Sequence, residues 1–112
     1  MIIDFDQIKE AHIQNFKGGE GELDTRNYVD RKGKIMYSTL RPGASTGLHT
    51  HEGNCEIIFI ISGIATFHYD GKVEVAREGQ VHYCPLGHSH YIENKTDHDL
   101  VYYAIVSEQP KK

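Results

Sequence analysis

The sequence feature that most limits the possible folds of this chain is a series of short strand-like runs separated by frequent turns. From Arg26 onward, segments rich in Tyr, Ile, Val, Phe and Thr alternate with corners that contain Gly, Pro, Asn or Asp. Because β-branched and aromatic side chains suit a pleated, half-buried surface, these segments predict consecutive β-strands. We expect strands at residues 34–41, 55–62, 64–69, 72–76, 81–84, 89–93 and 100–107. So many strands with such short connections predict an all-β sandwich or barrel.

The segment before Arg26 has a different character. Residues 6–12 form the one stretch with helical character, and the Gly-rich sequence at residues 18–21 follows soon afterwards. We therefore expect at most a short helical or irregular segment at the N-terminus. Because 112 residues are about the length of one ordinary domain, the chain is expected to be a single domain over residues 1–112.

Composition and charge favour a folded protein that binds neither nucleic acid nor membranes. Hydrophobic residues make up 38% of the chain and charged residues 25%, as in soluble globular proteins. The formal net charge is −4 and no stretch clusters Lys and Arg, so no basic surface is available for phosphate backbones or anionic lipids. The start of the chain lacks a signal-peptide pattern, and no apolar run is long enough to span a membrane, which predicts a cytoplasmic location. Cys55 and Cys84 are expected to be free thiols.

Histidines are unusually numerous in this chain, with eight in 112 residues. His49 and His51 are two residues apart in a region expected to be extended, so both side chains leave the same face of the backbone. Glu56 follows after a short loop that can return it to the same place, and His90 lies on a later strand. Three nitrogens and one oxygen suit Mn, Fe, Co, Ni, Cu or Zn better than Ca or Mg. These four residues are therefore candidate ligands for one divalent transition metal ion.

The spacing of these residues resembles the two sequence motifs of the cupin family. Residues 43–63 resemble the first motif: Gly43, five residues, His49-Thr50-His51, four residues, Glu56, six residues, Gly63. Residues 79–94 resemble the second: Gly79, five residues, Pro85-Leu86-Gly87, two residues, His90, three residues, Asn94. The 15 residues between the motifs match the short spacer of small one-domain cupins, often labelled mannose-6-phosphate isomerase-like. The resemblance implies a double-stranded β-helix, or jelly-roll barrel, with a metal in its mouth held by His49, His51, Glu56 and His90.

Alternation along the strands indicates which side chains form the wall of the metal pocket. If Glu56 faces inward, Ile58 and Ile60 face inward as well and form an apolar floor. On the strand that leads into the first motif, one face carries Tyr37, Thr39 and Arg41, and Arg41 offers a bidentate clamp for a carboxylate. Tyrosines expected near the mouth are Tyr91, Tyr102 and Tyr103, unless they simply fill the half-buried surface of a barrel.

The remaining polar residues near the second motif have open roles. His88 shares strand parity with His90 if the chain is extended there, so it either contacts the pocket or points to solvent. His82 is expected to be half-buried and hydrogen-bonded, and Asn94 to brace the loop after the His90 strand. The candidates for a catalytic role are His88, Tyr37 and Arg41.

Two classes of function remain open for such a metal-binding barrel. The first is a metal-dependent isomerase, lyase or dioxygenase that acts on a small polar metabolite such as a sugar or a carboxylic acid. The alternative is a module that binds such a ligand without converting it, because few titratable residues other than the metal ligands are available as a general base. Small cupins often form homodimers, so the resemblance also implies a homodimer, for which the segment before Arg26 offers an edge.

Overall fold

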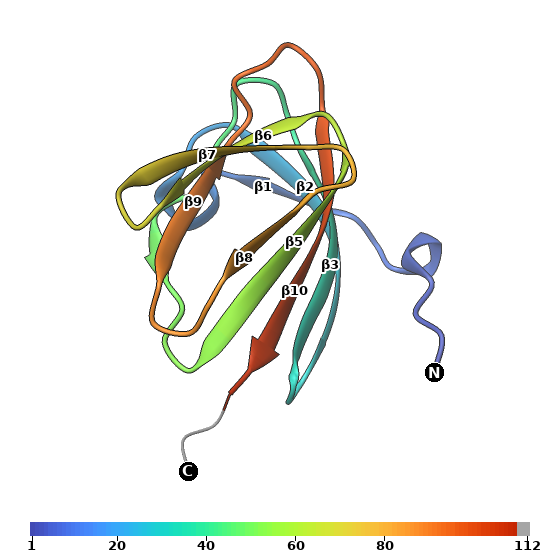
Figure 1. Ribbon diagram of the computed structural model, residues 1–112. Helices are drawn as coiled ribbons and strands as arrows, with labels where there is room; N and C mark the ends of the chain where they lie inside the picture. Colours follow the sequence, from blue (N-terminus) through green and yellow to red (C-terminus); the bar gives the residue numbers. More distant parts are fainter. Residues whose placement is uncertain (110–112) are drawn as a thin grey trace.

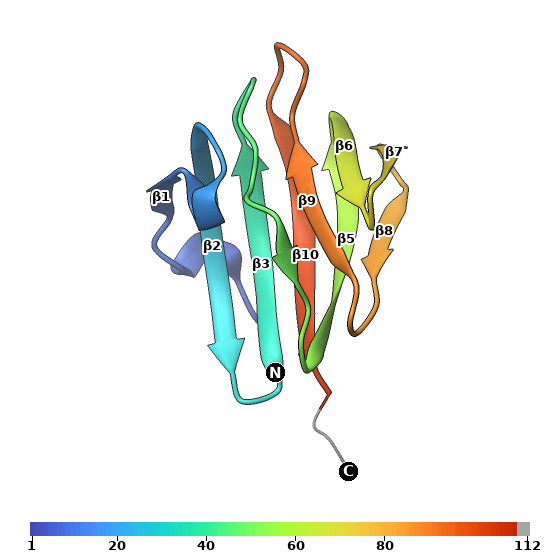
Figure 2. The ribbon, with the colours of Figure 1, turned by 90° about the vertical axis from the view of Figure 1, so that its left-hand side faces the viewer.

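The computed structural model describes residues 1–109, which form two antiparallel β-sheets that face each other (Figure 1). The six-stranded sheet has the order β1 (Ala11–Gln14), β2 (Glu22–Asp30), β3 (Gly33–Leu40), β10 (Leu100–Glu108), β5 (Asn54–Ser62) and β8 (Val81–Cys84). The four-stranded sheet has the order β4 (His49–Thr50), β9 (Ser89–Glu93), β6 (Ile64–Tyr69) and β7 (Lys72–Arg77). Figure 2 shows the long strands β2, β3 and β10 of the larger sheet running side by side. The predicted all-β jelly-roll barrel is confirmed.

The N-terminal region contains less helix and more strand than its sequence suggests. Its helical elements are two three-residue 3-10 turns, η1 (Phe5–Gln7) and η2 (Phe16–Gly18). The end of the expected helical stretch instead belongs to the edge strand β1, which pairs with β2. Strand β2 was missed because its sequence is mostly polar, although Leu23 and Thr25 are buried along it. Within residues 1–109, no helix is long and apolar enough to cross a membrane.

The core lies between the two sheets and follows the alternation of the strands. Ile58 and Ile60 are buried on the inner face of β5, as expected from the inward position of Glu56. Phe67, Leu40 and Leu100 are fully buried. Burying one such side chain stabilises the fold by about 1.5–3 kcal/mol relative to leaving it exposed. The apolar core therefore holds the sheets in place around the polar site described below.

The turn η2 is held against the segment Ser45–Gly47 by very close backbone packing. The amide of Gly47 donates a hydrogen bond to the carbonyl of Phe16 over 2.9 Å. A Cβ atom at Gly47 would lie 1.6 Å from the carbonyl oxygen of Lys17, so only glycine allows this approach. Lys17 itself has a left-handed backbone conformation with φ of 53°, which is strained for a residue with a side chain. The fold thus accepts local strain to keep Phe16 and Lys17 beside the barrel mouth.

Asn94 braces the loop after β9, as expected from the sequence. Its side-chain amide donates hydrogen bonds to the carbonyls of Leu40, over 2.9 Å, and His98, over 2.7 Å. Its side-chain oxygen accepts hydrogen bonds from the amide and the hydroxyl of Thr96. Asn94 is almost completely buried, and burying polar atoms without hydrogen-bond partners would destabilise the fold. These bonds provide the partners.

Candidate metal centre

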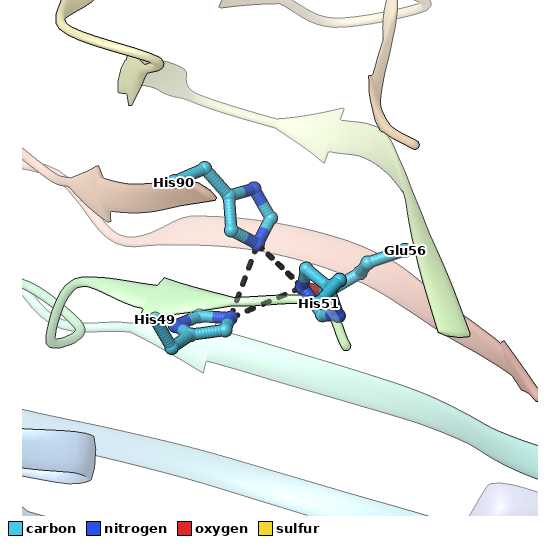
Figure 3. Close-up of side chains that lie close together, drawn as sticks. All are labelled: His49, His51, Glu56 and His90. Carbon is cyan, nitrogen blue, oxygen red and sulfur yellow. Dashed lines mark hydrogen bonds and ion pairs between the residues drawn. The ribbon is translucent and has the colours of Figure 1, made fainter. Parts of the chain in front are cut away.

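Three imidazole rings and one carboxylate converge inside the barrel (Figure 3). We call these four residues, His49, His51, Glu56 and His90, the His/Glu cluster. The Nε2 atom of His90 lies 2.9 Å from Nε2 of His51, 3.1 Å from Nε2 of His49 and 2.8 Å from Oε1 of Glu56. The candidate ligand atoms of all four residues lie within 4.8 Å of one another. The structure therefore brings together the whole set of ligands expected from the sequence.

Strand pairing explains why residues so far apart in the chain meet here. His49 on β4 lies directly opposite His90 on β9 in the antiparallel register. The backbone of His51 is hydrogen-bonded to the turn before β9, through its amide to His88 and its carbonyl to Gly87. Gly53 then adopts a φ of 84° and turns the chain into β5, which carries Glu56. The positive φ is easily reached by glycine, so this turn suits its sequence.

The other nitrogen of each imidazole is held by a hydrogen bond. Nδ1 of His49 lies 2.8 Å from the carbonyl oxygen of Gly47, and Nδ1 of His51 lies 2.6 Å from the side-chain oxygen of Asn54. Because both partners are acceptors, Nδ1 carries the proton in each ring and the Nε2 lone pair faces the cluster. Nδ1 of His90 lies 3.0 Å from Nε2 of His82. This arrangement directs three Nε2 atoms to one point.

The chemistry of the cluster fits a divalent metal ion. Glu56 is 8% exposed, and in residues 1–109 no lysine or arginine forms an ion pair with it. Burial opposes ionisation of Glu56, but its contacts with the three imidazoles hold its pKa well below the ordinary value. An ionised oxygen and imidazole lone pairs that face one another form a set of donors for a cation. Nitrogen and oxygen donors of this kind suit divalent transition metals.

A small cavity of about 60 Å³ adjoins the His/Glu cluster. Its apolar wall includes Ile58, Met36 and Ile92. The polar side chains around it, other than those of the cluster, are Lys17, Thr25, Asn27, Lys34, Ser38, Thr46 and Tyr102. A wider polar recess of about 430 Å³ shares both lysines and two of the cluster histidines with this cavity, so the cluster is reached from outside.

Lys17 and Lys34 are the cations at the rim of this cavity. Both are exposed to solvent on one side. Within residues 1–109, ion pairs to carboxylates are made by arginine and histidine side chains and none by a lysine. Desolvation lowers the pKa of Lys17, an effect that Glu56 opposes and Lys34 reinforces. The two lysines therefore place positive charge at the rim of the cavity, while Asp30, Glu52 and Glu108 line the wider recess outside it.

Tyr37 and Arg41 lie outside the cavity, so the expectation that they border it is wrong. Their strand presents Met36 and Ser38 to the interior instead. The Tyr37 ring packs against the rings of Phe5 and Tyr103, with centroid distances of 5.8 and 5.1 Å. Both faces of this strand contain apolar and polar residues, so alternation alone does not define its inner face.

Arg41 lies at the surface and pairs with two carboxylates, the buried Asp24 and the exposed Asp99. Its Nη2 lies 2.6 Å from Oδ2 of Asp24, and its Nη1 lies 3.1 Å from Oδ2 of Asp99. His88 is likewise away from the cavity, because its Nδ1 contacts Asp70 and lies 3.2 Å from the hydroxyl of Tyr69. None of the three candidate catalytic residues therefore lines the site.

Sequence reasoning missed most of the cavity-lining polar residues. Lys17 lies in a turn that the Gly-rich sequence only marks as irregular, and Thr25 and Asn27 lie on the missed strand β2. Tyr102, one of the three tyrosines expected near the mouth, does line the cavity. On β10, Tyr102 and Ala104 are buried and alternate with less buried residues. This alternation was a signal that could have distinguished the inward-facing Tyr102 from Tyr103.

Comparisons with known proteins agree with this fold. The family described as "Cupin domain" matches residues 36–106. An "Oxalate-binding protein" of Thermotoga maritima is 33% identical to this chain, over 95% of the chain and 93% of that protein. A crystal structure of a predicted oxalate decarboxylase from Thermotoga maritima has a TM-score of 0.89 and 33% identity and covers 96% of this chain and 99% of that one. The cupin domain of Schizosaccharomyces pombe Cnp3 has a TM-score of 0.78 at 12% identity, over 95% of this chain and 72% of that one, and shares the fold.

The position of Arg41 leads to a prediction about stability and pH. Burial raises the pKa of Asp24, but hydrogen bonds to its neighbours and the ion pair with Arg41 lower it overall. Stability from this carboxylate is therefore present above its unfolded pKa of about 3.9 and is lost as pH falls through the lower folded pKa. Replacing Arg41 by Ala should lower the melting temperature at pH 7, and the difference from the wild type should shrink in acid.

The same variant tests whether Arg41 belongs to the metal site. Because Arg41 lies outside the cavity, Arg41→Ala should keep the metal content of the wild-type protein. Melting curves at pH 7 and at acid pH, together with elemental analysis, measure both effects. Loss of metal from this variant would contradict the placement of Arg41.

Proposed function

Because this chain belongs to the cupin domain family, we propose that its His/Glu cluster binds one divalent transition metal ion and that this metal, with the adjoining cavity, binds a small carboxylate anion. The observation that carries the proposal is the convergence of three Nε2 atoms and a buried carboxylate beside a cavity that Lys17 and Lys34 also line. The ion is one of Mn, Fe, Co, Ni, Cu and Zn, which share a preference for such donors.

The size of the cavity favours a very small ligand. A water molecule needs at least about 10–15 Å³ of such space, so a cavity of about 60 Å³ holds about four to six water-sized groups. A two-carbon or three-carbon acid is small enough to fit in this volume, whereas a sugar is too large. The name of the Thermotoga maritima relative, an oxalate-binding protein, supports the same class of ligand. We propose oxalate, or a dicarboxylate of similar size, as the ligand.

The residues around the cavity have complementary roles in this proposal. A bound divalent metal would supply positive charge that accepts a carboxylate oxygen at an open coordination position. Lys17 and Lys34 attract the anion as point charges at the rim. Tyr102 stays protonated because burial raises its pKa far above neutrality, so its hydroxyl remains a hydrogen-bond donor. Ile58 and Ile92 exclude water from the inner wall.

Conversion of the ligand by a lyase, isomerase or dioxygenase reaction is the second candidate function. It is favoured by the amine of Lys17, which lines the cavity and is a candidate to exchange a proton with a ligand. Among the residues that line the cavity, the other titratable groups are the His/Glu cluster, Lys34 and Tyr102. This small number of groups is the reason that binding without conversion is the first proposal.

We also propose that the protein forms a homodimer through the outer face of the six-stranded sheet. Phe59 and Ile61 on β5 are 42% and 40% exposed, and Val81 and Tyr83 on the neighbouring β8 are 49% and 51% exposed. Phe59 pairs directly with Val81, so these apolar side chains form one continuous patch.

The single-domain organisation over residues 1–112 and a cytoplasmic location stay predictions.

The metal proposal predicts a clear effect of one ligand. His51→Ala should reduce metal content from about one ion per chain to a small fraction, because it removes one of the four candidate ligand atoms, the Nε2 that lies 3.1 Å from Oε1 of Glu56. His98→Ala is the control, since that side chain is 85% exposed and outside the cluster. Elemental analysis after reconstitution with each metal measures the outcome. A wild-type protein that takes up no metal, or a His51→Ala protein that keeps it, contradicts the proposal.

The ligand proposal predicts that the rim lysines determine anion affinity. In the metal-loaded protein, Lys17→Ala and Lys34→Ala should each weaken oxalate binding about tenfold, which corresponds to about 1.4 kcal/mol. Lys95→Ala, an exposed lysine away from the cavity, should leave binding unchanged. Titration calorimetry with oxalate and with acetate makes the measurement, and analysis of the recovered ligand shows whether it is converted. Equal affinities in all four proteins would rule out the lysine role.

The dimer proposal predicts that a charge on the apolar patch separates the subunits. Phe59→Glu should convert a dimer into a monomer, because a buried unpaired carboxylate is costly at an interface. Gel filtration with light scattering measures the mass of both proteins. A wild-type protein that is monomeric at high concentration contradicts this proposal.

A further inference from the structure

A further histidine, His82, lies behind the His/Glu cluster, on the side away from the cavity. Nε2 of His82 lies 3.0 Å from Nδ1 of His90, and Nδ1 of His82 lies 2.7 Å from Oε1 of Glu74. Strands β7, β8 and β9 supply Glu74, His82 and His90 respectively (Figure 1). Glu74 is half-exposed, whereas the other two residues are buried. These three residues connect the protein surface with the cluster, and we call them the Glu74–His90 chain.

The protons in this chain of contacts can be assigned from the acceptor at its outer end. An ionised carboxylate only accepts hydrogen bonds, so Nδ1 of His82 carries a proton and donates it to Glu74. A neutral His82 ring then has a lone pair on Nε2, which accepts a hydrogen bond from Nδ1 of His90. His90 is thereby left with a lone pair on Nε2, the atom that faces the cluster. The acceptor on β7 thus determines the tautomer of His90 two rings away.

Packing holds the middle ring of this chain in one orientation. The His82 ring stacks on Phe67 at a centroid distance of 3.8 Å and an interplanar angle of 13°. The Tyr69 ring meets it edge-on at 5.5 Å. His82 is 2% exposed, so the ring is enclosed by its neighbours. A half-turn of the ring would lose both hydrogen bonds and their alignment.

Glu74 is placed by strand pairing on the side that faces His82. It lies directly opposite Phe67 in the register of β6 and β7, and directly paired residues point to the same face of a sheet. Its neighbours on β7, Val73 and Val75, point to the other face and are exposed. Glu74 therefore reaches inward from an edge strand although half of it is open to solvent.

We propose that Glu74 and His82 are positioning residues that hold the Nδ1-protonated tautomer and the ring orientation of His90, and so set the metal affinity of the His/Glu cluster. This inference rests on the proposed metal site. It extends the arrangement seen for His49 and His51, whose Nδ1 atoms meet a backbone carbonyl and an amide oxygen. His90 differs because its partner is itself a titratable ring held by a carboxylate. Partners of this kind typically change metal affinity 10- to 100-fold when they are removed.

Three substitutions test the role of the chain. Glu74→Ala removes the outer acceptor at a half-exposed position where folding is little affected, and it should weaken metal binding about tenfold. Glu74→Gln keeps an oxygen that accepts the proton of His82, so it should restore most of the affinity. Glu78→Ala removes an exposed glutamate in the turn that follows β7 and should match the wild type. His82→Phe keeps the stacking on Phe67 but removes both hydrogen bonds, and it should weaken binding up to about 100-fold.

Two measurements separate positioning from a general loss of structure. Competition with a chelator of known affinity gives the dissociation constant for Zn²⁺ in each protein. Nitrogen-15 NMR of labelled histidines in the metal-free proteins reports the tautomer of His90, which should be protonated at Nδ1 in the wild type and mixed in Glu74→Ala. A variant that only loosens the fold would lower the melting temperature without this change of tautomer.

The outcomes distinguish this inference from the metal proposal. If the wild type binds Zn²⁺ while Glu74→Ala and His82→Phe keep its affinity and its His90 tautomer, the positioning role is refuted and the metal site stands. If His82→Phe does not fold, the result for Glu74→Ala decides. A wild-type protein that binds no metal refutes the metal proposal and this inference together.

Discussion

The convergence of three imidazole lone pairs and one carboxylate on a buried point is the constraint on which the rest of this structure depends. Such a cluster is costly in a protein interior, since buried polar groups must be satisfied and a buried charge must be compensated. The barrel meets this cost by giving every inward-facing ring a hydrogen-bond partner on its outer nitrogen. The strand pairing of His49 with His90 and the glycine turn before Glu56 then bring the four groups within reach of one another.

The cavity beside the cluster is divided between apolar and charged surfaces. Core side chains such as Ile58 and Ile92 serve both to stabilise the barrel and to form the inner wall of the cavity. Lys17 and Lys34 provide charge at the rim, where solvent limits the cost of desolvation. The same division explains why the cavity is small: the apolar core occupies most of the space between the sheets. The result is a small cavity with an apolar inner wall and two lysines at its rim.

Much of the fold and the candidate metal ligands could be predicted because both depend on local pattern. The strands after residue 33 are marked by β-branched and aromatic runs between turn residues, and the spacing of His49, His51, Glu56 and His90 predicts the candidate ligand set. The edge strand β1 and the polar strand β2 were not predicted, since their pairing with β3 compensates for weak strand propensity. Tyr37 and Arg41 were assigned to the wrong side because their strand has no clearly apolar face.

The sequence by itself determined the class of fold, the four candidate ligands and the glycines and the asparagine that shape the corners, because each of these depends on residue type and short-range spacing. Only the tertiary structure decided which polar residues surround the candidate ligands. Lys17, Lys34 and Tyr102 reach the cavity, and Glu74 reaches His82, through pairings between strands and turns that are distant in the chain. The facing of a strand is set by what packs against it, and a one-residue change in parity moves every side chain to the opposite surface.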